Sequence, residues 1–212
     1  MKQLAMTARF EKYLPLMREL IARDLKVKYR RSVLGYLWSL LNPLLMMAIL
    51  TMVFSQIFRF NIPNYPLYLI CGQTLWTFFN ESTNQAMYAV LSNGALLKKV
   101  YIPKYIFPIS RVLSSFVTMS FSLVAIVIVL LVTRTPLYWS ALLFPVPLFF
   151  LLLFSMGVGM VLSALSVYFR DVVHLYSVVT LAWMYLPPIF YSLDIVPQKV
   201  AFLLQCHHMF HY

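Results

Sequence analysis

A short polar run interrupts one of the longest apolar stretches of this sequence. Residues 60–97 contain a single charged residue, Glu81, and hydroxyl, amide and aromatic side chains surround it. A carboxylate at the bilayer centre costs about 2.5–3.5 kcal/mol on insertion scales, so this run should face a cavity or another helix. Aromatic rings beside hydroxyl and amide groups suit sugar rings, and an interhelical hydrogen-bond network is the structural alternative. The candidates for residues that face such a cavity are Trp76, Phe79, Asn80, Glu81 and Asn84.

An enzymatic role has little support among the residues that could do chemistry. With six acidic residues in the chain, catalysis by a pair of carboxylates is not expected. A nucleotide-binding loop ends in Gly-Lys-Ser/Thr, and none of the five glycines precedes a lysine. Metal-ligand spacing occurs only in Cys206-His207-His208, which we interpret as a sequence irregularity rather than a metal site. We therefore expect no catalytic residue, no metal and no cofactor bound by this chain.

The composition places most of the protein surface in lipid. Of the 212 residues, 62% are hydrophobic and only 11% are charged, against about 25% charged residues in soluble proteins. The net charge of +11 would suggest nucleic acid in a soluble protein. However, nine of the 17 basic residues lie within the first 31. Basic residues gathered in this way are typical topology signals, so we expect a membrane protein without a nucleic-acid partner.

Long apolar stretches with at most one charged residue each predict an all-α membrane fold with five transmembrane helices, preceded by an amphipathic helix. A crossing needs roughly 20 apolar residues. The stretches that meet this length are 36–58, 66–91, 111–133, 142–168 and 172–192. Because cytoplasmic loops carry the Lys/Arg excess, we expect the N-terminus and residues 92–110 inside. The loops near 59–65 and 134–141 should then lie outside, and Arg170 marks a third inner loop.

Two further segments are amphipathic and lie on the predicted inner side. Residues 8–33 place apolar side chains at helical spacing but are too polar to span, so they predict a helix in the interface plane. The chain thus divides into a cytoplasmic interface segment, 1–33, and a transmembrane domain, 34–212. Between the second and third crossings, an Asn-Gly turn leads into one amphipathic helical turn over 96–101. Each segment is either an anchor at lipid headgroups or a docking surface for a cytoplasmic partner.

The last two predicted crossings carry signals for close packing and for a kink. Ser155, Gly159 and Ser163 recur at i, i+4, i+8, a spacing that lets helix backbones approach closely, within one chain or between two copies. Pro187-Pro188 interrupts the fifth crossing, and the freed carbonyls need partners from protein or water. Simple termination of the helix is the alternative.

Several of these segments together resemble a known family. The run from Arg23 to Trp38, followed by Asn42-Pro43-Leu44, resembles the N-terminal signature of ATP-binding-cassette permeases that export polysaccharides or polyol phosphates. These include O-antigen, capsule and teichoic-acid exporters. The residues that carry the signature are Arg23, Asp24, Lys26, Tyr29, Arg30, Gly35, Trp38 and Pro43. The loop 93–103, the step at 168–171 and residues 188–191 are similar to further landmarks, in family order.

The resemblance implies a function that the residues alone do not. It implies a non-catalytic, multi-pass permease subunit of the cytoplasmic (inner) membrane, N-terminus inside, which exports a lipid-linked polysaccharide or polyol phosphate. Two separate ATPase subunits would use ATP and Mg, and a second copy of the chain would complete a channel. The segment 8–33 becomes an interface helix, and the second-to-third loop becomes a coupling helix inserted into an ATPase cleft. The implied coupling residues are Leu96, Leu97, Lys98, Lys99, Val100, Tyr101 and Pro103.

One departure from the family concerns the end of the chain. Family members have six crossings, whereas this sequence stops at Tyr212, with Cys206-His207-His208 where an Asn-Pro pair is expected. We therefore expect that the sixth helix is missing through truncation or a sequence error.

Two other functions stay open at the level of sequence. A membrane-embedded enzyme acting on lipid-linked sugars would have to draw on Glu81, Asp171, His174 and Asp194. A proton-coupled transporter would rely on Glu81 alone. Co-purification with an ATPase subunit separates the exporter from both.

Overall fold

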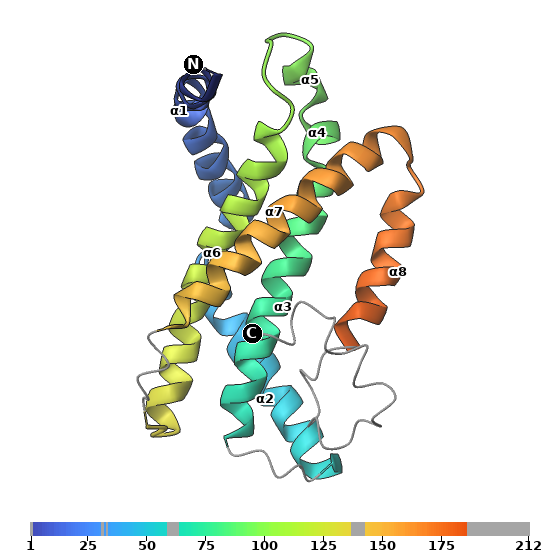
Figure 1. Cartoon of the computed structure of the whole chain (residues 1–212). Coiled ribbons are helices and arrows are strands. Elements are labelled where there is room, and N and C mark those ends of the chain that lie inside the picture. The colour runs from blue at the N-terminus through green and yellow to red at the C-terminus, as the bar shows by residue number, and fades with distance from the viewer. Residues whose placement is uncertain (1, 31, 33, 59–63, 137–142, 186–212) are drawn as a thin grey trace.

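All regular structure in the described part of the chain is helical. The structure is a computed structural model that describes residues 2–30, 32, 34–58, 64–136 and 143–185 (Figure 1). Its helices are α1 (Lys2–Tyr29), α2 (Leu37–Phe58), α3 (Tyr65–Met87), α4 (Ala89–Ser92), α5 (Gly94–Leu97), α6 (Ile106–Val132), α7 (Pro145–Tyr168) and α8 (Val172–Tyr185). The prediction of an all-α membrane fold is confirmed.

Among the described residues, three helices, α2, α6 and α7, are long and apolar enough to cross a membrane. Their bounds agree closely with the predicted stretches, except that α6 begins five residues early, at Ile106. Pro108 does not delay it, because proline is tolerated in the first turn of a helix. The apolar helix α8 is described for 14 residues. Residues 186–192 of the fifth predicted crossing, with Pro187-Pro188, lie outside the described part, so five crossings stay a prediction.

The helix α3 is long enough to span but more polar than its neighbours, and its position explains why. It packs against α2, α6, α7 and α8 in the middle of the bundle. Its buried apolar residues, such as Leu69 and Phe79, form the main core with Val112 and Met119 of α6 and Leu151 of α7. A central helix is shielded from lipid by its neighbours, so it can carry polar residues that an outer helix cannot.

The small residues of α7 pack within the chain. Ser155, Gly159 and Ser163 are all buried, and a Cβ placed on Gly159 would lie 2.8 Å from the Cβ of Ala86 on α3. The Ser166 hydroxyl donates a 2.7 Å hydrogen bond to the Met87 carbonyl, next to the same contact. Of the two interpretations of this spacing, the structure supports packing between helices of one subunit.

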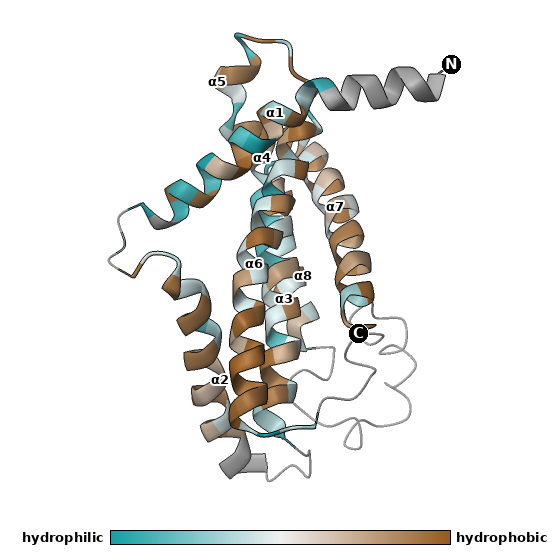
Figure 2. Ribbon diagram, turned by 90° about the vertical axis from the view of Figure 1, so that its left-hand side faces the viewer, coloured by the Kyte–Doolittle hydropathy of each residue, from teal (hydrophilic) through white to brown (hydrophobic). Residues whose placement is uncertain are grey.

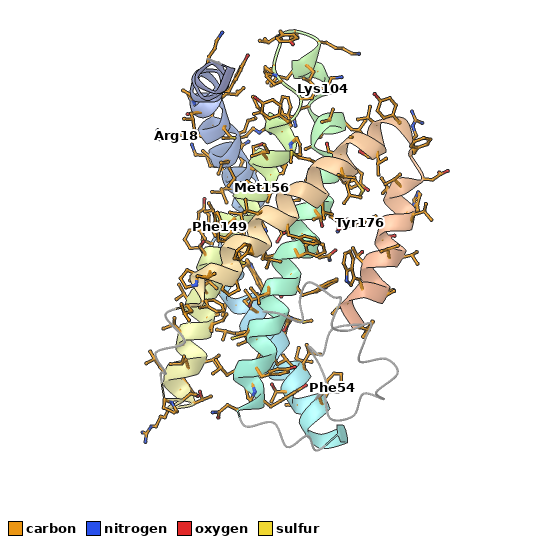
Figure 3. All side chains as sticks on the ribbon, viewed as in Figure 1. Arg18, Phe54, Lys104, Phe149, Met156 and Tyr176 are labelled. Carbon is orange, nitrogen blue, oxygen red and sulfur yellow. The ribbon has the colours of Figure 1, made fainter. Side chains whose placement is uncertain are left out.

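The predicted inner segments share one end of the molecule. In Figure 1, α1, α4, α5 and the turn between α7 and α8 lie at the top, while the last turns of α2 and α6 and the first turn of α3 lie at the bottom. Figure 3 places Arg18 and Lys104 at the top and Phe54 near the bottom. The helices α2, α6 and α7 are hydrophobic along most of their length, as the brown ribbons of Figure 2 show. This arrangement is the one that the Lys/Arg pattern requires, although which end faces the cytoplasm remains a prediction.

Cysteine labelling would decide the orientation. Lys99→Cys and Thr135→Cys lie at opposite ends, and both residues have accessible surface. We expect a membrane-impermeant maleimide, applied to intact cells, to label Thr135→Cys and to reach Lys99→Cys only after permeabilisation, because basic loops stay in the cytoplasm. The chain has two native cysteines, Cys71 within α3 and Cys206, and replacing both by alanine provides a background without cysteine. Outside labelling of Lys99→Cys would invert the predicted topology.

Candidate functional site

One face of α3 is polar along most of its length. Gln73, Thr77, Glu81 and Gln85 recur every four residues, which places them on one side of the helix. Neighbouring members of this face are linked, since the Gln85 side-chain amide donates to a Glu81 carboxylate oxygen at 2.8 Å. The Asn84 amide likewise donates to the Asn80 side-chain oxygen at 2.7 Å. We call these six residues, 73, 77, 80, 81, 84 and 85, the polar face of α3.

The two aromatic candidates of this run are both buried, and only Trp76 reaches a cavity. Phe79 is fully buried, with its ring 5.6 Å from Phe154 of α7 and 5.6 Å from Trp183 of α8. The prediction that Phe79 faces a cavity is therefore wrong for the single chain. It lies two residues, or about 200° of helical rotation, from Glu81. Trp76 is also largely buried, although it contributes to the edge of a cavity.

Glu81 is paired with a base from a distant segment. Lys28, in the last turn of α1, donates to Glu81 and forms an ion pair with it. Glu81 also lies only six residues before the end of α3, roughly 9 Å along the helix axis, on the side of α1 and α4. The expected cost of an isolated carboxylate at the bilayer centre is thus avoided, because Glu81 is paired with Lys28 and lies near the end of α3 rather than at its middle. Half-exposed pairs contribute little stability, so the pair matters mainly for charge balance.

Two cavities adjoin the polar face of α3. The first, about 410 Å³, lies between α1, α2, α3 and α6. The second, about 500 Å³, lies between α2, α3 and α8. Both are lined by Met46, Gln73, Thr77 and Glu81. Asn80 and Asn84 line the second cavity, and their place in a channel stays a prediction. The polar face of α3 therefore borders space in the structure. Thr83 of the same run instead accepts a 2.6 Å hydrogen bond from the Tyr176 hydroxyl of α8, as the structural alternative expects.

The interface helix α1 is fastened to the bundle by a charged cluster. The Asp24 side chain is only 6% exposed, and its carboxylate lies 3.2 Å from Arg23 and 3.1 Å from Arg111 of α6. The Arg111 contact is close enough for an ion pair but is not aligned as a hydrogen bond. Arg23 also donates to the Asn93 side chain at 3.4 Å. Met17 and Leu20 add an apolar contact with the start of α6, so α1 and the second-to-third loop form one unit.

The remaining signature residues lie around the turn from α1 to α2. Lys26 and Arg30 are exposed, and the side chain of Tyr29 lies outside the described part. Gly35 has φ +49°, a left-handed conformation that favours glycine, and its N–H is bonded to the Ser32 hydroxyl at 3.1 Å. Trp38 and Pro43 line the first cavity. The signature thus builds the turn and one wall of that cavity.

The predicted coupling loop divides into an anchored half and a projecting half. Leu96 and Leu97, in α5, pack against the apolar cluster that holds α1. Val100 is 53% exposed and Tyr101 92% exposed, and Lys98 and Lys99 are exposed beside them. The chain turns back to the bundle at half-buried Pro103. Exposed apolar side chains at the end of the molecule are typical of an interaction surface.

A family comparison extends over almost the whole chain. Residues 15–211 match the family described as ABC-2 type transporter. The chain belongs to this family. An ABC-2 transporter is a membrane protein, in agreement with the apolar helices α2, α6 and α7.

Individual relatives of this ABC-2 transporter chain carry names that describe export. It is 32% identical over 186 residues to an O-antigen export system permease protein RfbA of Klebsiella pneumoniae, covering 86% of this chain and 71% of the relative. It is 32% identical over 189 residues to the RfbA protein of Myxococcus xanthus, covering 89% and 73%. A capsule polysaccharide export inner-membrane protein CtrC of Neisseria meningitidis is 23% identical over 192 residues, covering 85% and 69%.

Several residues that line the first cavity of this ABC-2 transporter chain were not predicted from the sequence. The first cavity is also lined by Lys28 of α1, Ser39 and Asn42 of α2, and Ser115, Thr118 and Ser122 of α6. The three residues of α6 follow the i, i+3, i+7 spacing of one helical face, which was a readable signal in an otherwise apolar segment. Among the residues that the structure describes, no group of three His, Cys, Asp or Glu side chains could hold a metal. The cluster Cys206-His207-His208 lies outside them.

Proposed function

We propose that this chain is the permease subunit of an ATP-driven exporter, which moves a polysaccharide across the cytoplasmic membrane. The observation that carries the proposal is the polar face of α3, which borders two cavities inside an apolar bundle. Amide and hydroxyl groups at such a depth are costly unless they serve a pathway or a contact. The names of the relatives, O-antigen and capsule polysaccharide export, support glycans as the substrate class. A lipid carrier on the glycan is part of the same proposal.

The energy source would be a separate cytoplasmic ATPase that uses ATP and Mg. Its proposed docking surface consists of Val100 and Tyr101, the basic pair Lys98–Lys99 and the exposed side of α1. The contacts between Asp24, Arg23, Arg111 and Asn93 would carry movement of this surface into α6. We further propose that two copies of the chain form the channel, with the second cavity of each facing the pathway.

The enzyme alternative gains no support from the site. Glu81 is paired with Lys28, whereas Asp171 lies in the turn before α8 and His174 is exposed in its first turn. These groups come from separate places in the bundle and do not converge on one cavity lining. Asp194 lies outside the described residues.

A transport assay with the reconstituted complex tests the proposal. The chain would be co-expressed with a cassette ATPase encoded beside its gene, and the complex would be purified and placed in vesicles. We expect the two proteins to co-purify and a lipid-linked glycan to become inaccessible to a membrane-impermeant lectin in inverted vesicles. Uptake should require ATP and fail with a non-hydrolysable analogue. Chemical change of the glycan without translocation would instead identify the membrane enzyme.

A further inference from the structure

Three residues that line the first cavity carry buried polar atoms without a hydrogen-bond partner among the described residues. Thr74 of α3 and Ser115 of α6 are each only 4% exposed, and both line this cavity. The hydroxyl oxygens of both, and the side-chain oxygen of Gln73, have no hydrogen-bond partner among the described residues. Buried polar groups are nearly always hydrogen-bonded in folded proteins. The cavity, of about 410 Å³, is large enough for several water molecules or a small ring.

Other hydroxyl groups of the lining use only their donor and keep acceptor capacity for a further hydrogen bond. The Ser39 hydroxyl donates to the Tyr36 carbonyl at 2.6 Å, Ser122 donates to the Ser39 carbonyl at 2.9 Å, and Thr118 donates to the Ser114 carbonyl at 3.2 Å. Each hydroxyl oxygen keeps lone pairs that can accept a further hydrogen bond. The lining therefore offers acceptors together with the rotatable hydroxyls of Thr74 and Ser115, which suits a ligand that carries several hydroxyl groups of its own.

The charge of the cavity is balanced and its walls are partly apolar. Lys28 and Glu81 are the charged residues of the lining, and they pair with each other. A charged ligand would therefore have to compete with this ion pair. Trp38, Met46, Phe78 and Met119 supply apolar surface, and a sugar ring presents C–H faces to such groups and hydroxyls to polar ones.

We propose that the cavity between α1, α2, α3 and α6 binds an uncharged sugar ring. This inference rests on the proposed export function, because the ligand would be one sugar unit of the exported chain, held beside the polar face of α3. The site adjoins the second cavity, which lies on the α8 side of the same helix and shares Gln73, Thr77 and Glu81 with it. The sugar head of a membrane glycolipid has the same chemistry and is the second possible source.

Binding would be measured on the complete chain in a polyether detergent, since maltoside detergents would occupy the site. Titration with methyl glucoside or maltose should give a saturable change in tryptophan fluorescence that Trp38→Phe removes. Ser115→Leu fills the cavity and should weaken binding about tenfold or more, and Ser115→Ala, which keeps the space, should weaken it less. Ser120→Leu, on the exposed side of α6, is the matched control and should bind normally. No saturable signal, or equal binding by Ser115→Leu, would mean that the cavity holds only water.

Neutralising Glu81 tests whether the same site selects uncharged sugars. In the Glu81→Gln variant Lys28 loses its carboxylate, so glucuronic acid should bind about tenfold more tightly than to the unchanged chain, while methyl glucoside changes little. Equal affinity of the unchanged chain for glucuronic acid and methyl glucoside would contradict the preference for uncharged sugars.

Uptake and competition measurements on the reconstituted exporter distinguish the two possible sources of the sugar, the exported glycan and a glycolipid head. If the site holds the exported glycan, Ser115→Leu lowers glycan uptake about as much as it lowers sugar binding. If it holds a glycolipid head, vesicles with glucosyl diacylglycerol compete with methyl glucoside and uptake is unchanged. Uptake failure by the unchanged complex would refute the export function while leaving the binding measurement valid. Unchanged uptake without competition by the glycolipid would overturn the inference.

Discussion

Val100→Asp is expected to reduce export about tenfold or more without changing membrane insertion. Val100 is 53% exposed at the end of the molecule, so a carboxylate there remains in water in the free chain. Docked in an apolar cleft of the ATPase, the same carboxylate would lose its hydration, and burying a charge costs well above the roughly 1.4 kcal/mol that corresponds to a tenfold change. The measurements are glycan uptake in vesicles and the amount of ATPase that co-purifies.

Neighbouring residues supply matched variants for this prediction. Tyr101→Ala removes a side chain that is 92% exposed and should also weaken docking, because aromatic side chains contribute strongly to interface energies. Charge reversal at Lys98 and Lys99 should matter less if apolar insertion dominates, since exposed charges at an interface rim mainly affect the association rate. Normal uptake and co-purification with Val100→Asp would remove this loop from the docking surface.

Gly159→Val is expected to prevent normal folding, whereas Gly157→Val, two residues earlier on the same helix, should be tolerated. A Cβ on Gly159 would lie 2.8 Å from the Cβ of Ala86 and 3.4 Å from Val112. The same atom on Gly157 meets nothing within 4 Å. Overpacking a close contact costs about 1–3 kcal/mol, and sometimes more. The branched side chain should therefore separate α7 from α3 and cut the yield of monodisperse protein severely.

A double variant shows whether this contact is the cause. Gly159→Ala alone should lower the thermal midpoint of the purified chain. Adding Ala86→Gly removes the opposing Cβ and should recover part of the loss, although glycine in a helix costs about 1 kcal/mol by itself. Such recovery is the non-additivity expected of residues in contact. Equal loss in Gly157→Val and Gly159→Val, or strictly additive effects in the pair, would contradict close α3–α7 packing at this point.

The main features of the fold could be predicted from sequence because they depend on local chemistry. A helix that faces lipid needs about 20 apolar residues in a row, so α2, α6 and α7 were readable with bounds close to those observed. The spacing of Gln73, Thr77 and Glu81 on a helix places them on one face whatever surrounds them. The N-terminal signature likewise indicated the family, because it is a contiguous run of residues.

Only the tertiary structure decided which residues meet. The partner of Glu81, Lys28, lies 53 positions away in the chain, and nothing local to either residue specifies that α1 ends beside α3. The burial of Phe79 between α7 and α8 depends on the rotation of α3 relative to two later helices. The hydroxyls of the first cavity come from three different helices. Helical periodicity orders side chains around one axis, whereas contacts between helices depend on how several axes pack, which is why the sequence predicted a polar face but not the cavities beside it.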